Sequence, residues 1–437
     1  MPLLIIAFGV ALQVYLTYKK ISPFLSLLIV AIVVGLLLGM HPSDLVVSIE
    51  KGVGSTLSGL ALIICLGAVL GKILEASGAI NQITSNLIRN FGERHVQWAV
   101  LLTGFLVGLP LYYNAGFIIL VPLVFSVARR TGLPLLYIAI PTAASLSATH
   151  CFLPPHPGPV VLVNAFNADL GLTLVYGLIL VIPIVIIAGP FLGKLLKNIG
   201  ATANGNSFHE QPVEPTNPPS PFASFIIALM PVLLISLAVV VDTFFKSAGT
   251  IYSIIQFFGN PNIALLTSVL LAVYFFGTRR GTDMHTIMEW LTEGISGIAM
   301  ILLIITAGGV LKEVLIDSGT GKYITSFSSE WQINPYLFAW IITALLRIAL
   351  GSATVAGLTA AGIVSPLVLS GVVSPELMVL AVGSGSVFCS HINDTGFWMF
   401  KEFFNLSLKQ TFMSWTVMES LMSVLGLLGI LVLQQFV

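Results

Sequence analysis

The sequence predicts an all-α polytopic membrane protein made of two inverted-topology repeats, each with a re-entrant hairpin and a broken transmembrane helix. Of its 437 residues, 57% are hydrophobic and 8% are charged, whereas about 25% of residues are charged in a soluble domain. Apolar runs of about 20 residues, the length of one helical crossing, follow one another nearly from end to end. Stretches such as Phe24–Met40 are apolar at consecutive positions, unlike the alternating strands of an outer-membrane barrel. An internal repeat with a fixed offset of 241 residues adds the twofold organisation.

Charge and cysteine content exclude several other classes of protein. The 18 basic and 18 acidic residues cancel, so no nucleic-acid partner is implied, and membrane lipid is the expected surrounding. Cys65, Cys151 and Cys389 lie far apart without the spacing of metal ligands, so we expect packing roles, no metal and no cofactor. The first apolar segment has neither a basic n-region nor a small-residue cleavage site, and we expect it to be retained.

Gly, Pro and charge clusters divide the apolar sequence into helical spans. We expect these near 3–18, 23–40, 57–75, 97–128, 134–150, 172–193, 223–243, 262–277, 296–315, 336–371, 375–390 and 412–435. The spans 97–128 and 336–371 are longer than one crossing and too short for two crossings with a turn. Each suits a re-entrant hairpin, with its tip at PLYYNAG (110–116) or GSATVAG (351–357). A long, tilted and kinked helix is the alternative.

Lys and Arg residues in the short loops set the expected orientation. Twelve of the 18 basic residues can be placed on one side, which is then cytoplasmic: Lys19, Lys20, Arg89, Arg94, Arg129, Arg130, Lys194, Lys197, Arg279, Arg280, Lys401 and Lys409. The opposite loops, at 41–56, 151–171, 244–261 and 316–335, contain only Lys51, Lys246 and Lys322. This orientation requires the first hairpin to enter and leave on the cytoplasmic side.

The two halves of the chain align with the offset of 241 residues. Leu66–Ile83 overlays Ala307–Ile324 with seven identities in 18 positions, and the same offset carries Ser145 onto Ser386. The basic loop 76–96 corresponds to a more acidic loop at 317–337, and this change of charge predicts opposite topology. We expect a first inverted repeat at 1–199, a cytoplasmic linker at 200–221 and a second inverted repeat at 222–437.

Inverted repeats with interrupted helices are typical of secondary transporters, in which substrate and coupling ions bind near the middle of the bilayer. At the first tip, Tyr113 and Asn114 are candidate substrate ligands, and Gly116 allows a substrate to approach the backbone closely. A turn that is satisfied by its own amides is the alternative interpretation of this tip.

The second tip contains Gly351, Ser352 and Thr354, with Arg347 one turn before it. Arg347 lies in apolar sequence, where exposure to lipid would cost from about 3 to more than 10 kcal/mol. A guanidinium binds carboxylates through two parallel hydrogen bonds, so we expect a small organic anion as the substrate. The alternative is a structural ion pair with Asp394 or with helix-end carbonyls.

Two further polar clusters occupy equivalent positions in the two halves. The first contains Ser145, Ser147, Thr149 and His150 and runs into CFLPPHPGP (Cys151–Pro159), whose prolines interrupt a helix and free its carbonyls. The second contains Ser384, Ser386, His391, Asn393 and Asp394. The candidate substrate ligands in these two clusters are Ser145, Thr149, His150, Ser384, Ser386 and Asn393. His150, His391 and Asp394 are candidates for carrying a proton, and hydrogen-bonded packing is the alternative for the histidines.

Two alternatives concern the remaining polar residues. A membrane-embedded enzyme would use His150, His156 and His391 with Asp394, but their spacing has no nucleophile or metal constellation, and we expect no enzyme. Glu419, inside the last helix, is expected to form a helix–helix hydrogen bond, with a minor relay as the alternative.

The motifs resemble the gluconate permease family, gluconate:proton symporters within the ion transporter superfamily. The resemblance covers nearly the whole chain and is carried by MPLLIIAFGVAL, IEKGVGSTLSGLA, GAVLGKIL, HVQWAVLLTGFLVG, THCFLPPHPGP, LRIALGSATVAG, ELMVLAVGSGSV, SHIND and GFWMFKEFFNLS. It implies uptake of gluconate or a close sugar acid across the bacterial inner membrane, coupled to protons. The superfamily further implies scaffold and transport domains, an elevator-like movement and a homodimer.

One departure from the family pattern concerns the coupling ion. The family's first tip reads aromatic-aromatic-Glu-hydrophobic-Gly, and here Asn114 stands in the place of the Glu. Since asparagine does not titrate, coupling would use Asp394 or a histidine, would use Na+, or would be absent. The family also includes carriers of D-serine and other hydroxy acids, so these remain alternative substrates.

Overall fold

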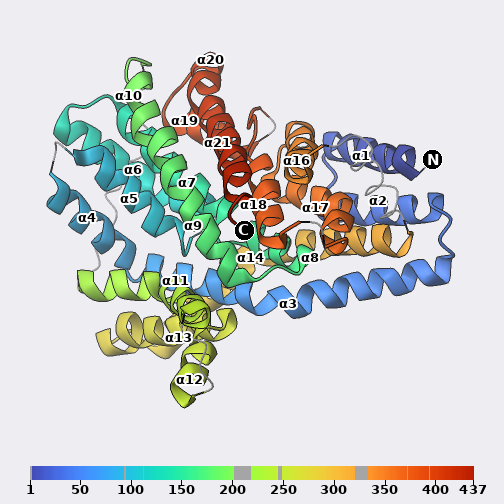
Figure 1. Ribbon diagram of the computed structural model, residues 1–437. Coiled ribbons are helices and arrows are strands. Elements are labelled where there is room, and N and C mark those ends of the chain that lie inside the picture. The colour runs from blue at the N-terminus through green and yellow to red at the C-terminus, as the bar shows by residue number, and fades with distance from the viewer. Residues whose placement is uncertain are drawn as a thin grey trace.

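The computed structural model describes residues 2–92, 95–111, 113–200, 218–244, 249–319, 333–371, 373–392 and 394–437. Every regular element in these ranges is helical (Figure 1), which confirms the all-α prediction. The elements are α1 (Pro2–Tyr18), α2 (Pro23–Leu37), α3 (Pro42–Ala76), α4 (Ala79–Phe91), α5 (Val96–Gly108), α6 (Tyr113–Thr131), α7 (Leu135–Phe152), α8 (Pro157–Phe166), α9 (Leu170–Ile186), η2 (Ile187–Phe191), α10 (Leu192–Leu196), α11 (Pro221–Phe244), α12 (Thr250–Gly259), α13 (Pro261–Ala272), η3 (Val273–Gly277), η4 (Thr278–Arg280), α14 (Met284–Asp317), α16 (Pro335–Leu350), α17 (Ala353–Leu369), α18 (Pro375–Gly385), α19 (Thr395–Phe403), α20 (Leu408–Thr411), η5 (Phe412–Thr416) and α21 (Val417–Leu433).

Two long helices, α3 and α14, pack against each other in antiparallel orientation. Lys51, near the start of α3, pairs with Glu313 and Asp317, near the end of α14. At the opposite ends of the two helices, the Nζ of Lys72 lies 3.1 Å from a carboxylate oxygen of Glu293. In Figure 1, α3 and α11–α13 lie in the lower part, α1 and α2 lie at the upper right, level with α16 and α17, and α4–α7 lie on the left.

The predicted starts of these two helices, at 57 and 296, are wrong. Helix α3 begins at Pro42, and α14 begins after Asp283, whose side chain caps it by accepting a hydrogen bond from the Thr286 amide at 2.8 Å. The first turns of both helices contain polar residues, which lower the local hydropathy, so hydropathy alone placed the helix starts too late. Their backbone hydrogen bonds are nevertheless satisfied within the helix. Helices α4, α8 and α12 also lie in segments that we expected to be loops: α4 is rich in polar residues, whereas α8 and α12 are apolar but have only 10 residues each, too few for a crossing.

The helix breaks in the two unusually long spans are present. Helix α5 ends at Gly108 and α6 begins at Tyr113, while α16 ends at Leu350 and α17 begins at Ala353. Two further breaks separate α7 from α8, at Leu153–His156, and α18 from α19, at 386–394. Most of the predicted linker 200–221 and of the loop 317–337 falls outside the described residues.

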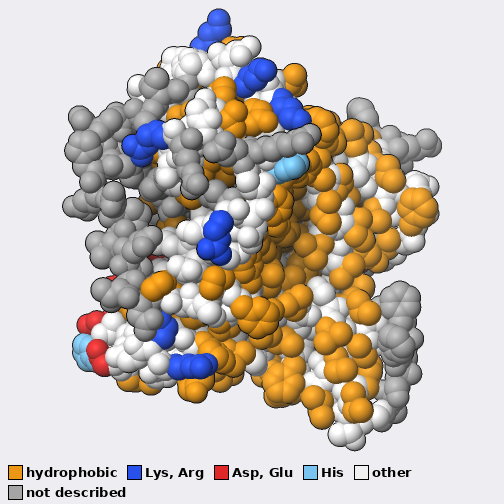
Figure 2. Space-filling model, turned by 90° about the vertical axis from the view of Figure 1, so that its left-hand side faces the viewer, with side chains coloured by type: hydrophobic (Ala, Val, Ile, Leu, Met, Phe, Trp, Pro, Cys, Tyr) orange, Lys and Arg blue, Asp and Glu red, His pale blue; other side chains and the backbone are white. Residues whose placement is uncertain are grey.

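The surface suits a lipid environment. Among the described residues, six helices are long and apolar enough to cross a membrane, or seven if the bent helix α3 counts as one span. Leu195, Phe222 and Ile251 have 78, 76 and 76% of their surface exposed, an arrangement that water penalises and lipid does not. Figure 2 shows the left-hand side of Figure 1, on which hydrophobic side chains form a broad region beside scattered Lys and Arg residues.

The contact between α3 and α14 gives a prediction for stability. A Cβ on Gly52 would lie 2.7 Å from the backbone of Val310, whereas a Cβ on Gly54, on the same helix, would meet nothing within 4 Å. We expect Gly52→Ala to lower the free energy of unfolding by about 1–3 kcal/mol through overpacking. Gly54→Ala should be neutral or slightly stabilising, because alanine favours the helix. Thermal unfolding of the purified variants in detergent measures both, and equal midpoints would contradict this packing.

Candidate functional site

A cavity of about 370 Å³ lies between the two predicted hairpin tips, and its volume is that of a small-molecule site. The end of α7, the start of α6, the α16–α17 turn, the start of α19 and the η5–α21 segment surround it. Its lining residues are Tyr113, Asn114, Ser147, His150, Cys151, Ile301, Arg347, Leu350, Gly351, Ser352, Ala353, Thr354, Val387, Asp394, Thr395, Gly396, Trp415 and Glu419. The two tips therefore share one chamber.

Arg347 is the buried cation of this chamber. It lies in the last turn of α16, is 4% exposed, and donates from Nη2 to the carboxylate of Asp394. Its Nε and Nη1 have no hydrogen-bond partner within the described parts of the chain. Arg347 thus forms the ion pair that the sequence left as an alternative, and it also keeps two donors for an anion.

Asp394 is held from several sides. Besides the bond from Arg347, it accepts from the Ser390 hydroxyl and, at 2.9 Å, from the Gly396 amide at the start of α19. The Ser390 hydroxyl in turn accepts from the Trp415 indole at 2.7 Å. These bonds fix the position of the carboxylate, and through it that of the guanidinium.

Three helix N-termini open onto the cavity. Tyr113 begins α6, Ala353 begins α17 after the Ser352 cap, and Thr395 begins α19 after the Asp394 cap. Backbone amides at a helix N-terminus are unsatisfied within the helix and carry partial positive charge. Together with Arg347, these termini make the chamber suitable for an anion.

Other polar side chains that line the cavity suit hydroxyl groups. The hydroxyl of Tyr113 and Nδ1 of His150 are buried and have no hydrogen-bond partner within the described ranges. The two rings lie 6.4 Å apart, and the Tyr113 ring is 5.6 Å from the Trp415 ring. Asn114 also lines the cavity and is exposed. A polyhydroxylated ligand could satisfy these groups.

Several predicted ligands lie away from the cavity. Ser145 donates to the Pro141 carbonyl at 2.9 Å, and Thr149 donates to the Leu146 carbonyl at 2.9 Å, both within α7. These two hydroxyl-bearing residues pack against Gly104 and Gly108 of α5. Helix α7 therefore turns them toward its neighbour, and from α7 only Ser147, His150 and Cys151 line the chamber.

The remaining predicted residues divide as follows. Gly116 packs against Leu146, and the Ser384 hydroxyl bonds the Ala381 carbonyl at 2.9 Å. Ser386 lines a separate cavity of about 20 Å³ that His150 and Thr354 also reach. His391 is half-buried and does not line the main chamber, and Asn393 lies outside the described residues.

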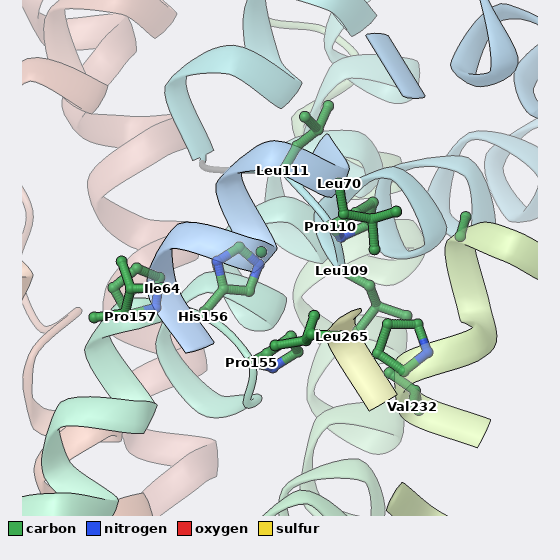
Figure 3. A pocket seen from close by; sticks show the side chains of 13 residues that line it. Ile64, Leu70, Leu109, Pro110, Leu111, Pro155, His156, Pro157, Val232 and Leu265 are labelled. Carbon is green, nitrogen blue, oxygen red and sulfur yellow. The ribbon is translucent and has the colours of Figure 1, made fainter. Parts of the chain in front are cut away.

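A second small cavity lies behind the first tip, between Leu109–Leu111, Pro155–Pro157 and helices α3, α11 and α13 (Figure 3). Its volume of about 20 Å³ accommodates about one water molecule, which excludes it as a sugar-acid site. The His156 ring bonds the Gly108 carbonyl and lies 5.3 Å from the His150 ring. His156 thereby connects the end of α5 with the break between α7 and α8.

Cys151, Trp415 and Glu419 line the cavity although none of them was predicted as a site residue. The Ser147 hydroxyl donates to Glu419 at 3.0 Å, which is the helix–helix hydrogen bond expected for this glutamate, here between α7 and α21. Glu419 is the one acidic residue in its apolar helix, and this pattern could be recognised in the sequence. The packing of that helix beside α7 could not be predicted from the sequence.

Comparison with known proteins identifies the family. The family model described as GntP family permease matches residues 1–437. The chain belongs to the GntP permease family. This confirms the resemblance carried by the motifs and assigns the chain to transporters rather than enzymes. As a GntP permease with bacterial relatives, it is a multi-pass protein of the inner membrane.

Individual relatives match this GntP permease over nearly its whole length. It is 47% identical to a high-affinity gluconate transporter of Escherichia coli K12 over 100% of both chains. It is 46% identical to the Gnt-II system L-idonate transporter of the same organism, over 99% of this chain and 98% of the relative. The crystal structure of the Alcanivorax borkumensis YdaH transporter matches with a TM-score of 0.66 at 15% identity, covering 98% of each chain, and thus shares the fold.

The second tip gives a prediction about transport. Gly351 has a φ of 75°, in the region that favours glycine, and it lines the cavity, whereas Gly371 has a φ of 73° at the far end of α17. Alanine at either position costs about 1–2 kcal/mol of backbone strain. Gly351→Ala should lower the rate of transport about tenfold by displacing the tip, and Gly371→Ala should leave it near the wild-type rate. Equal uptake by the two variants, at matched protein levels, would argue against a role for the tip.

Proposed function

We propose that this GntP permease imports gluconate or a closely related sugar acid across the bacterial inner membrane by proton-coupled symport. The observation that carries the proposal is Arg347, a buried guanidinium with two free donors in a cavity between the two tips. Its charge, with the three helix N-termini, favours a carboxylate, while Tyr113, Asn114 and His150 suit the hydroxyls of the ligand. Relatives named as gluconate and L-idonate transporters support this substrate class.

Two inverted repeats and an elevator-type movement belong to the same proposal. Shifting α3 by 241 residues gives 283–317, which is within one residue of α14, and these two helices pack antiparallel. The same shift places α5 within two residues of α16 and α6 within three residues of α17. Antiparallel packing of equivalent helices supports a pseudo-twofold axis in the membrane plane.

The arrangement of helices also supports a division into two domains. We assign α3, α14 and their neighbours to a scaffold, and the hairpins α5–α6 and α16–α17 with the broken helices to the moving transport domain. A homodimer, as the family resemblance implies, would join two scaffolds. The mass of the purified protein in detergent measures the oligomeric state.

Removal of the Arg347 charge tests the substrate site. Uptake of labelled gluconate into proteoliposomes should fall at least tenfold in Arg347→Ala, because truncation of a buried charge pair costs several kcal/mol of binding. The double variant Arg347→Ala/Asp394→Asn removes the orphaned carboxylate and keeps a helix cap at residue 394, and its uptake should remain low.

Arg280→Ala is the matched control for Arg347→Ala. The Arg280 guanidinium donates to the main-chain oxygen of Ser77 at 3.1 Å instead of pairing with a carboxylate, and it does not line the cavity. Its removal should leave uptake near the wild-type rate at equal expression. Normal uptake by Arg347→Ala would show that Arg347 is not part of the substrate site.

The driving ion gives a separate prediction. A pH gradient imposed across wild-type proteoliposomes, acidic outside and without Na+, should drive accumulation of gluconate above the external concentration. Accumulation that requires Na+ would favour the alternative of a Na+-coupled carrier, and equilibration without accumulation would favour an uncoupled one. A parallel thermal-shift series of aldonates, uronates and D-serine tests whether another hydroxy acid binds instead.

A further inference from the structure

We propose that Glu419 binds the coupling proton, and that protonation of its carboxyl allows the substrate anion to occupy the cavity. This inference rests on the proposed function, since it names the proton-binding group of the same site. Asn114 at the first tip does not titrate, so that tip offers no carboxyl for the proton.

The position of Glu419 is the first argument. It lies in the first turn of α21, is 2% exposed and lines the cavity. Its Oε2 accepts a hydrogen bond from the Ser147 hydroxyl at 3.0 Å, whereas Oε1 is buried and has no hydrogen-bond partner among the residues described. A proton on this carboxyl would be a donor facing the chamber, available to a ligand oxygen.

The charge of the chamber is the second argument. The charged and titratable groups that share it with Glu419 are Tyr113 from α6, His150 and Cys151 from α7, Arg347 from α16 and Asp394 at the start of α19. With the histidine neutral, Arg347 and Asp394 cancel, so an ionised Glu419 leaves one net negative charge. A sugar acid would add a second negative charge to a desolvated site, which is unfavourable.

Protonation of Glu419 removes this repulsion. The chamber then has no net charge, and the free donors of Arg347 can pair with the substrate carboxylate. Proton and anion consequently favour each other's binding, and this coupling is reciprocal. Such mutual dependence is the thermodynamic requirement for symport.

The other titratable groups fit this role less well. Both carboxylate oxygens of Asp394 accept hydrogen bonds, from Arg347 and Ser390 on one and from the Gly396 amide on the other. A proton on His150 would give the chamber the same net charge, but it would leave a charged ring whose buried Nδ1 has no hydrogen-bond partner within the described ranges. His391 does not line the cavity.

The variant Glu419→Gln tests the inference, because it keeps the shape and an acceptor for Ser147 while removing the titratable group. Two assays on proteoliposomes separate its effects: accumulation of labelled gluconate driven by a pH gradient, and exchange of external labelled for internal unlabelled gluconate. We expect accumulation to be lost, and exchange to become independent of pH, whereas wild-type exchange declines as the pH rises. Glu313→Gln is the matched control, since Glu313 is 6% exposed but pairs with Lys51 outside the cavity.

Accumulation by Glu419→Gln within twofold of the wild type would overturn the inference. Failure of the proposed function would appear in the wild type itself, as the absence of gluconate transport or of pH-driven accumulation. If Glu419→Gln does not fold, Ser147→Ala decides, because it removes the hydrogen bond to the carboxyl. The pH of half-maximal accumulation should then move by about one unit, and an unchanged pH profile would contradict the role of Glu419.

Discussion

The positive charge of Arg347 is the constraint around which the site is organised. A guanidinium that is 4% exposed has given up its contact with bulk water, and its burial is tolerable only beside an opposite charge. Asp394 supplies that charge, and it is fixed by Ser390, by the Gly396 amide and, through Ser390, by Trp415. The breaks at the ends of α16 and α18 are therefore needed, because they bring Arg347 and Asp394 together and leave helix termini open to the chamber.

Much of the site could be predicted from the sequence, because its residues break local rules. Arg347 in an apolar span, glycines and small polar residues in the middle of long spans, and prolines after His150 all conflict with an uninterrupted helix in lipid. The direction in which a helical side chain points could not be predicted in this way. Ser145, Ser147 and Thr149 share one helix, yet only Ser147 faces the cavity, because the packing of α7 against α5 sets the rotation of the helix.

Hydropathy was a poorer guide to the length of the helices than to their existence. Helices α3 and α14 continue far into polar sequence, where Lys51 pairs with Glu313 and Asp317 and Lys72 pairs with Glu293. The partners of these charges lie in the other half of the chain, about 220 to 270 residues away, so no local sequence pattern predicts these ion pairs. The same long-range pairing makes Glu419 part of the site, since Ser147 reaches it from a helix that is remote in sequence.

A structure of the protein with bound gluconate, determined by electron cryo-microscopy in lipid nanodiscs, would test the central claim most directly. We predict ligand density between the two tips, with its carboxylate against a free N–H group of Arg347 and its hydroxyls toward Tyr113 and His150. Density for the ligand elsewhere, with this chamber empty at saturating gluconate, would contradict the account.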